Sequence, residues 1–227
     1  MRKKRNIREI LIRYVILIVG LFIMALGVAL STKADLGTSP ISCVPYVLSL
    51  LIPFTMGEIM FAMLFSFVIL QIILLRKDYE WLQLTQLIVA IIFSIVTDIT
   101  MKMVQGIEIH NYILRWVICM ISFFFVALGI FIEVKADVSL MAGDGLIKAI
   151  SKVSHCEFSK VKIFFDSTLT IAGAVISFIA FYKLKGVREG TIAAAIIVGM
   201  IVRWLKKNWT NIDEIISKLA VSDSVIE

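Results

Sequence analysis

The sequence predicts an all-α integral membrane protein. Its six transmembrane helices form two inverted three-helix repeats, each with a short half-helix after its first span. Three observations lead to this fold class. The 227 residues are 60% hydrophobic with a mean hydropathy of +0.97, one segment of the chain occurs twice, and each copy begins a series of three apolar runs. Runs of about 20 apolar residues can cross a hydrocarbon core about 30 Å thick.

The repeated segment begins at Arg13 and recurs, without a gap, 102 positions later at Arg115. Its first copy is RYVILIVGLFIMALGVALSTKAD and its second is RWVICMISFFFVALGIFIEVKAD. Both copies keep the first Arg, an Ala-Leu-Gly triplet and a terminal Lys-Ala-Asp. Chance similarity between apolar helices would match Leu, Ile and Val, but would not also align these residues. The chain is therefore predicted to be an internal duplication.

Each long apolar run is interpreted as a helix, because backbone groups in lipid must be hydrogen-bonded within the protein. We expect spans near residues 12–31, 57–75, 82–102, 112–132, 160–182 and 189–204. The sixth run is short, which leaves open whether it crosses the membrane fully. The predicted divisions are a basic cytoplasmic tail (1–11), repeat 1 (12–104), repeat 2 (105–206) and an amphipathic or disordered tail (207–227).

Basic residues orient these spans, because Lys and Arg accumulate on the cytoplasmic side of a membrane. With the N-terminus inside, 17 of the 23 basic residues are cytoplasmic, and the basic loop 183–188 is the main exception. We therefore expect a multi-pass membrane protein with a cytoplasmic N-terminus. Three spans per copy is an odd number, so the second copy enters from the opposite face. Inverted repeats with interrupted helices are typical of secondary transporters.

A weaker apolar segment follows the first span of each copy, and we interpret it as a half-helix, at 38–52 and at 141–153. In the first copy, Thr38 or Ser39 can cap a helix that begins at Pro40. In the second copy, Asp144 of Gly-Asp-Gly is the candidate cap. A helix start presents free N–H groups and a positive dipole end. Two half-helices entering from opposite faces would meet near the midplane and favour a small anionic or polar ligand there.

Ionisable residues near these helix starts and inside the spans are the candidate ligand contacts, since charges in lipid are costly and often functional. An alternative for each Lys-Ala-Asp triplet is that its side chains reach the headgroups beside an ordinary turn. For Asp98 the alternative is an ion pair with Lys102, and for Asp166 a pair with Lys162. The predicted substrate-binding residues are Lys33, Asp35, Thr38, Ser39, Lys135, Asp137, Asp144, Asp98 and Asp166.

Other classes of function find little support. The three cysteines are far apart, which indicates neither a metal site nor a disulfide framework. The two histidines, His110 and His155, fall in loops on opposite sides of the predicted topology, and the chain has no Ser-His-Asp set. No nucleotide-binding loop is present. The basic N-terminus suits anionic lipid better than nucleic acid. We expect no enzyme activity, cofactor, metal or nucleic-acid partner.

The repeated Leu-Gly and Lys-Ala-Asp motifs, the Gly-Thr-Ser-Pro turn, Gly143-Asp144-Gly145, Asp98 and Gly190-Thr191 together resemble the YczE/YitT group of bacterial integral membrane proteins. The resemblance extends over about residues 13–206. It implies a six-span inner-membrane protein with a duplicated core, and it implies no particular substrate. In the second copy Met141-Ala142 replaces Ser39-Pro40.

The leading functional prediction is a secondary-type transporter or exporter of a small polar or anionic molecule. A substrate-binding membrane subunit of a multi-component importer is the second possibility. A non-transporting accessory or sensory membrane protein is the third. The lipid bilayer and a small-molecule substrate are the expected partners, and a homodimer is left open.

Overall fold

The computed structural model describes residues 7–209, and this part of the chain is helical throughout, with no strand. The predicted C-terminal tail lies outside the described residues from position 210 onward. The helices are α1 (Ile7–Ala34), α2 (Pro40–Ser49), α3 (Met56–Leu75), the short 3-10 turns η1 (Arg76–Asp78) and η2 (Trp81–Leu84), α4 (Thr85–Met103), α5 (Tyr112–Ala136), α6 (Ala142–Ser154), α7 (Phe158–Phe181) and α8 (Glu189–Asn208).

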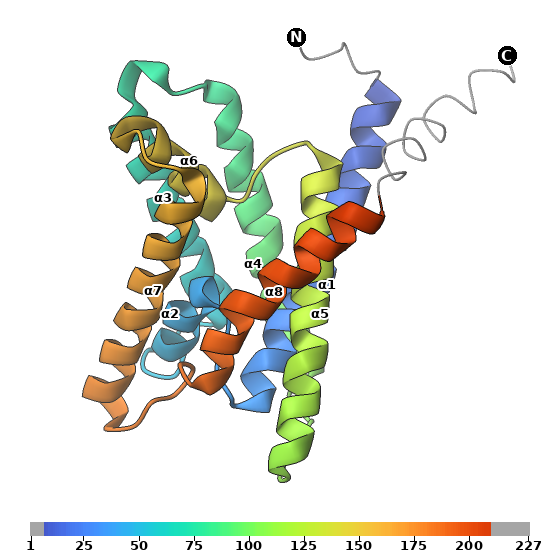
Figure 1. The fold of residues 1–227 in the computed structure, drawn as a ribbon, viewed down its shortest axis with the longest axis vertical. Helices are drawn as coiled ribbons and strands as arrows, with labels where there is room; N and C mark the ends of the chain where they lie inside the picture. Colours follow the sequence, from blue (N-terminus) through green and yellow to red (C-terminus); the bar gives the residue numbers. More distant parts are fainter. Residues whose placement is uncertain (1–6, 210–227) are drawn as a thin grey trace, which may run out of the picture.

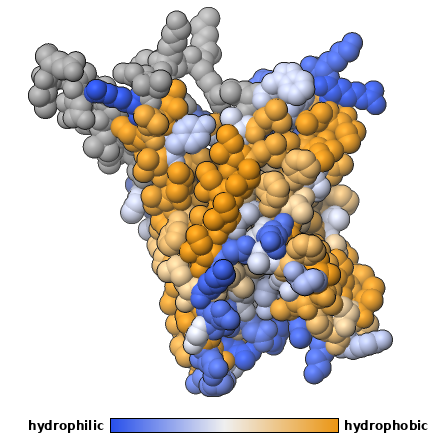
Figure 2. All heavy atoms as spheres, turned by 180° about the vertical axis from the view of Figure 1, so that it is seen from behind, coloured by the Kyte–Doolittle hydropathy of each residue, from blue (hydrophilic) through white to orange (hydrophobic). Residues whose placement is uncertain are grey.

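Five of these helices, α1, α3, α4, α5 and α7, are long and apolar enough to cross a membrane. Successive long helices run alternately down and up in Figure 1, where α1 begins and α8 ends at the upper end. Large apolar side chains such as Phe164 (74% exposed) and Ile179 (70%) face outward. Figure 2 shows an apolar surface over much of one face, with hydrophilic residues at the two ends and a hydrophilic strip that extends from the lower end to the middle of the face. The chain is a multi-pass membrane protein.

Helix α8 crosses obliquely over α5 (Figure 1) and is not among the five apolar helices. Its last two turns carry Arg203, Lys206 and Lys207, which lower its hydropathy. The sixth span therefore stays a prediction. Below, the end of the molecule where α1 begins is called the N-terminal face, and the end where α1 stops and α5 begins is called the far face.

The order of helices in residues 7–103 recurs in residues 112–208 at the spacing of the sequence duplication. The ends of α1 and α5 are residues 34 and 136, α2 and α6 begin at 40 and 142, and α3 and α7 begin at 56 and 158, each 102 positions apart. Helices α4 and α8 begin at 85 and 189, 104 positions apart. The local sequence signals that start and stop each helix have thus been kept in both halves.

Helices α1 and α5 pack closely against each other through the duplicated Ala-Leu-Gly triplets. A Cβ atom on Gly27 would lie 2.7 Å from the backbone N of Val126, and one on Gly129 would lie 2.7 Å from the backbone N of Met24. Gly27 and Gly129 are duplicates of each other, as are Met24 and Val126. The same pair of positions is therefore in contact twice, once with the glycine on α1 and once with the glycine on α5. The two contacts lie on either side of a point near the middle of both helices, which run antiparallel. Small residues permit this close approach of two backbones.

The duplicated arginines hold the two ends of the α1–α5 pair. Arg13, only 8% exposed, donates to the carbonyl oxygen of Ala136 (3.1 Å) at the N-terminal face. Arg115 donates to Asp35 Oδ2 (2.9 Å) at the far face. Each arginine lies in the first two turns of one long helix and binds the end of the other, so the repeated Arg and Lys-Ala-Asp motifs have an architectural role.

The remaining helices pack around this pair with one asymmetry. Helix α2 lies against α7, and α6 lies against α3, so each half-helix contacts a long helix of the other half. Helix α3 packs against α4, whereas α7 and α8 do not pack extensively within residues 7–209.

Candidate substrate site at the two half-helices

A side chain from the first turn of α2 reaches the first turn of α6. Ser39 and Met141, the residues that precede them, are both extended, with φ −63° and −58°. A Cβ atom on Gly143 would lie 2.7 Å from Cδ1 of Ile41. Ile41 and Gly143 are duplicates of each other, so each half-helix meets its counterpart at its start.

The start of α2 is sealed by the segment that leads into α8. Thr38, which is fully buried, donates to the carbonyl oxygen of Gly186 from its backbone N (3.0 Å) and from Oγ1 (3.2 Å). The backbone N of Gly190 donates to the carbonyl oxygen of Leu36 (2.7 Å). Gly37 has a φ of +113° and leaves no room for a side chain, because a Cβ would lie 2.9 Å from the backbone N of Arg188. The far face is closed at this position.

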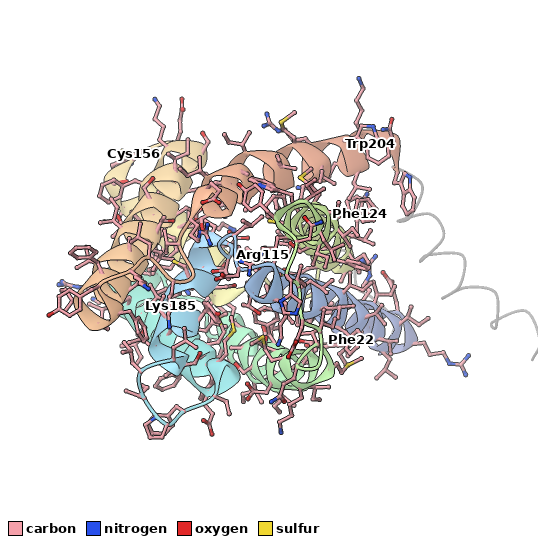
Figure 3. The ribbon with its side chains drawn as sticks, turned by 90° about the horizontal axis from the view of Figure 1, so that it is seen from below. Phe22, Arg115, Phe124, Cys156, Lys185 and Trp204 are labelled. Carbon is pink, nitrogen blue, oxygen red and sulfur yellow. The ribbon has the colours of Figure 1, made fainter. Side chains whose placement is uncertain are left out.

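Asp35 lies just before this sealed segment, and two arginines of the protein bind Asp35. Its Oδ2 lies 2.9 Å from Nη1 of Arg115 and 3.7 Å from Nη1 of Arg188, which also donates to the Asp35 carbonyl oxygen (2.9 Å). Figure 3, viewed from the far face, shows Arg115 near the centre of the molecule beside the end of α1. Lys33 donates to the carbonyl oxygen of Gln105 (2.7 Å). These two predicted ligand contacts are engaged in closing the far face.

Neither half-helix has the side-chain cap that the sequence suggested. Ser39 is the N-cap of α2, but its hydroxyl donates to Ser42 Oγ (3.0 Å) and makes no capping bond. Helix α6 begins at Ala142, so Asp144 lies within its first turn, and the prediction that Asp144 caps this helix is wrong. A side chain of α5 binds the residue before α6: Oε1 of Glu133 accepts a hydrogen bond from the backbone N of Met141 (2.9 Å). This hydrogen bond fixes the extended segment before α6.

Charged side chains gather around the first turn of α6. The Lys162 ammonium lies 3.0 Å from Asp144 Oδ1 and 3.9 Å from Asp166 Oδ2, and all three side chains are partly buried. Glu133, 5% exposed, interacts electrostatically with Asp144 and Lys162. The group thus joins three carboxylates to one ammonium. The corresponding positions of the first half are uncharged: Ser31, Ser42, Met60 and Leu64.

Two buried glutamines lie beside the same helix and were missed by the sequence analysis. Gln71 of α3 is fully buried, and its Nε2 donates to Gln86 Oε1 (3.1 Å) and to the carbonyl oxygen of Ala142 (3.0 Å). The Gln71 Oε1 atom is buried without a hydrogen-bond partner. Gly145 makes room for both amides, since its Cβ would lie within 2.9 Å of each. The only signal in the sequence was an uncharged polar residue in each of two apolar runs.

A cavity of about 240 Å³ lies beside α6, between α6 and the connection from α3 to α4. Gln86 and Gly145 contribute to its wall. Lys152 and Asp78, which also line it, form an ion pair of 2.8 Å that joins α6 to η1. The hydrogen bond and charge of Lys152 lower the pKa of Asp78 below its ordinary value.

The remaining predicted residues have structural contacts of their own. Asp98 accepts hydrogen bonds from Thr55 Oγ1 (2.6 Å) and from the backbone N of Gly57 (2.8 Å), so it stabilises the start of α3. Asp137 ends α5 in the left-handed conformation (φ 46°), as Asp35 does after α1 (φ 53°). The carbonyl oxygen of Lys135 accepts a hydrogen bond from Arg13 (3.4 Å).

The arrangement suits recognition of a small polar ligand by side chains and helix starts. Within residues 7–209, no group of three His, Cys, Asp or Glu side chains is placed to hold a metal ion.

Fold and site together define an all-helical, multi-pass membrane protein with a polar centre. A family model matches residues 11–207, and the chain belongs to this family, a family of unknown function (DUF6198). No curated protein and no solved structure matches the chain.

Proposed function

We propose that this protein is a secondary-type transporter or exporter of a small polar or anionic molecule, with six spans in two inverted repeats and the substrate site between them. The observation that carries the proposal is the pair of half-helices. They begin at duplicated positions and meet at Ile41 and Gly143, yet one start is sealed and the other lies beside a polar cavity. Half-helices that meet between inverted repeats form the substrate site in several secondary transporters.

The contacts between α1 and α5 support the inversion. Two duplicated helices that run antiparallel and exchange equivalent contacts are related by a two-fold axis perpendicular to both. For helices that cross a membrane, this axis lies in the membrane plane. Each half then needs three crossings, with α8 as the sixth span.

The two faces of the protein differ as an alternating-access mechanism requires. At the far face, Thr38 and Gly186 close the start of α2, and Asp35 holds Arg115 and Arg188. At the N-terminal face, the cavity reaches Gly145 of α6. The distribution of basic residues favours a cytoplasmic N-terminal face, and a bacterial inner membrane is part of the proposal. The structure is then an inward-open form, and export or import requires breaking the contacts at the far face. Kinship with the YczE/YitT group is part of this proposal and rests on the motifs alone.

Thiol labelling tests the inversion at two duplicated positions. Cys156 is exposed between α6 and α7, while Cys43 and Cys119 are buried. Its duplicate, Phe54, is 55% exposed between α2 and α3. We expect a membrane-impermeant maleimide to label Phe54→Cys in Cys156→Ser protein on intact spheroplasts, and to label native Cys156 only after permeabilisation. Labelling of both positions from the same side would overturn the inverted arrangement.

Transport is tested with the purified chain alone in liposomes. We expect a radiolabelled solute to exchange across the membrane when the same unlabelled solute is inside, with no other subunit present. Uptake that appears only with a co-purifying ATPase would replace this proposal with the importer-subunit alternative.

A further inference from the structure

The cavity beside α6 contains one charge of each sign without a protein partner. Four charged residues line it, and two of them, Asp78 and Lys152, are paired with each other. Lys148 and Glu80 are both exposed, and neither forms an ion pair or side-chain hydrogen bond within the described part of the chain. The charges of the lining residues balance, so the cavity favours a ligand that also carries both signs.

The wall of the cavity offers a directed hydrogen-bond donor. The Oε1 atom of Gln86 accepts from Gln71, whose own amide orientation is set by donation to the carbonyl oxygen of Ala142. The amide NH₂ of Gln86 is therefore left for a ligand oxygen. Such a donor, together with the Lys148 ammonium, suits a carboxylate or a similar oxyanion.

Two residues with unpartnered buried polar atoms are neighbours of residues that line this cavity, although neither lines it itself. Among the described residues, Gln71 Oε1 and Tyr79 Oη are buried without a hydrogen bond. Gln71 binds the cavity residue Gln86, and Tyr79 lies in the chain between the cavity residues Asp78 and Glu80. Buried polar groups are nearly always hydrogen-bonded. Both exceptions occur in the part of the protein that surrounds the cavity, and the ligand contacts are therefore argued from Lys148, Glu80 and Gln86, which line it.

The size of the cavity limits the ligand. Its volume of about 240 Å³ lies below the roughly 300–1,000 Å³ of sites for drug-sized ligands. A metabolite with a few polar groups fits this space better than a larger organic anion.

We propose that the cavity binds a small zwitterionic group, with its oxyanion held by Lys148 and the Gln86 amide and its ammonium group held by Glu80. Two sources supply this chemistry: a free amino-acid-type solute and the headgroup of phosphatidylethanolamine. The binding site itself does not depend on the proposed function. Only the further step, that a free solute bound here is the transported substrate, rests on it.

Binding is measured on the full-length protein in phosphatidylglycerol nanodiscs, by thermal unfolding and isothermal calorimetry. The probes are alanine, β-alanine and γ-aminobutyrate, with propionate and ethylamine as analogues that keep one charge each. We expect at least one zwitterion to raise the unfolding temperature saturably, and neither single-charge analogue to do so. Equal stabilisation by propionate or ethylamine would overturn the proposal.

A second set of nanodiscs, in which phosphatidylethanolamine replaces part of the phosphatidylglycerol, separates the two sources. Stabilisation by this lipid together with loss of the solute response assigns the site to the headgroup. An unchanged solute response assigns it to the free solute. Absence of any response to the zwitterions and to the lipid would refute the site.

Two charge-removing variants locate the binding. Lys148→Gln and Glu80→Gln should each weaken zwitterion binding, or the stabilisation by phosphatidylethanolamine if the headgroup is the ligand, by about tenfold or more, as expected for loss of a charged hydrogen bond. Lys160→Gln and Glu157→Gln are the matched controls, because these residues form an exposed ion pair (3.4 Å) outside the cavity. The controls should retain wild-type affinity. Unchanged affinity in Lys148→Gln or Glu80→Gln contradicts the proposal, whereas binding without flux in liposomes contradicts only the transport function.

Discussion

The starts of α2 and α6 lie at equivalent positions of the repeated sequence, 102 residues apart, yet their surroundings are opposite in character. The start of α2 is covered by residues 186–190 and has uncharged neighbours, apart from the Asp35 ion pairs at its edge. The start of α6 is surrounded by Glu133, Asp144, Lys162 and Asp166 and borders a cavity. The two helix starts are alike in position, while the side chains around them make one a closure and the other a polar site.

The connections between the long helices explain part of this difference. The segment from α7 to α8 passes directly over α2, where the backbone of Gly186 accepts from Thr38 and a Cβ on Gly186 would meet the ring of Tyr46. The matching segment from α3 to α4 forms η1 and η2 and leaves the cavity between itself and α6. The polar groups near α6 therefore stay accessible, whereas the start of α2 is covered by packed residues.

The largest expected effect comes from Gly37→Ala at the closed start. Alanine is strained at a φ of +113°, and its Cβ would clash with the backbone of Arg188 and Thr191. We expect a loss of roughly 2–5 kcal/mol in the free energy of unfolding, measured by SDS titration in mixed micelles. Gly199→Ala is the control, because nothing lies within 4 Å of that Cβ. Equal stability of the two variants would show that the far face is not closed as described.

The next largest effect concerns the charged group at α6. Lys162→Met introduces the residue of the first half, Met60, and leaves Asp144 and Asp166 without their cation. We expect a loss of about 1–2 kcal/mol, at the low end for such groups because Lys162 is partly exposed. Adding Asp144→Ser, which copies Ser42, should recover part of this loss in the same titration. A double variant less stable than Lys162→Met would contradict the charge-pairing explanation.

Thr38→Val should have a moderate effect on the closed start. It removes the Oγ1 hydrogen bond to Gly186 but leaves the backbone hydrogen bond in place. We expect a loss of about 1 kcal/mol and faster proteolysis of the 183–188 loop. Thr168→Val is the matched control, since the Thr168 hydroxyl is exposed on α7 and donates to Phe164. Identical proteolysis rates of the wild type, Thr38→Val and Thr168→Val would argue against the closure.

The smallest expected effect is the pH dependence of the Asp78–Lys152 pair at the open face. Because Lys152 lowers the Asp78 pKa below its ordinary value of 3.8, the pair stabilises the fold above that pH. This contribution is lost as the pH falls through the lowered pKa of the folded protein. Asp78→Asn should remove this step from the unfolding temperature measured between about pH 6 and pH 3, whereas Glu157→Gln should retain it. A wild-type pH profile in Asp78→Asn would exclude the pair as its source.

Much of the helical framework was predictable because helix formation in lipid is local. Every backbone group must find a partner within its own segment, so apolar length and the turn residues decide where a helix runs. The sequence predicted half-helices at 38–52 and 141–153, and the structure has them at Pro40–Ser49 and Ala142–Ser154. The charged candidates Asp144 and Asp166 were identified because a charge in an apolar run is conspicuous.

The partners of these residues were not predictable, because they depend on the packing of distant segments. Asp35 meets Arg115 and Arg188, which are 80 and 153 positions away, and Gln71 meets Gln86 and the backbone of α6. No local pattern specifies such contacts.

The sequence by itself determined the medium, the helices and the duplication, since these follow from hydropathy and backbone hydrogen bonding along the chain. Only the tertiary structure decided which duplicated helix start is sealed and which polar groups surround the other. This difference depends on how the two connecting segments pack against α2 and α6. Packing between distant segments produces no repeating pattern along the sequence.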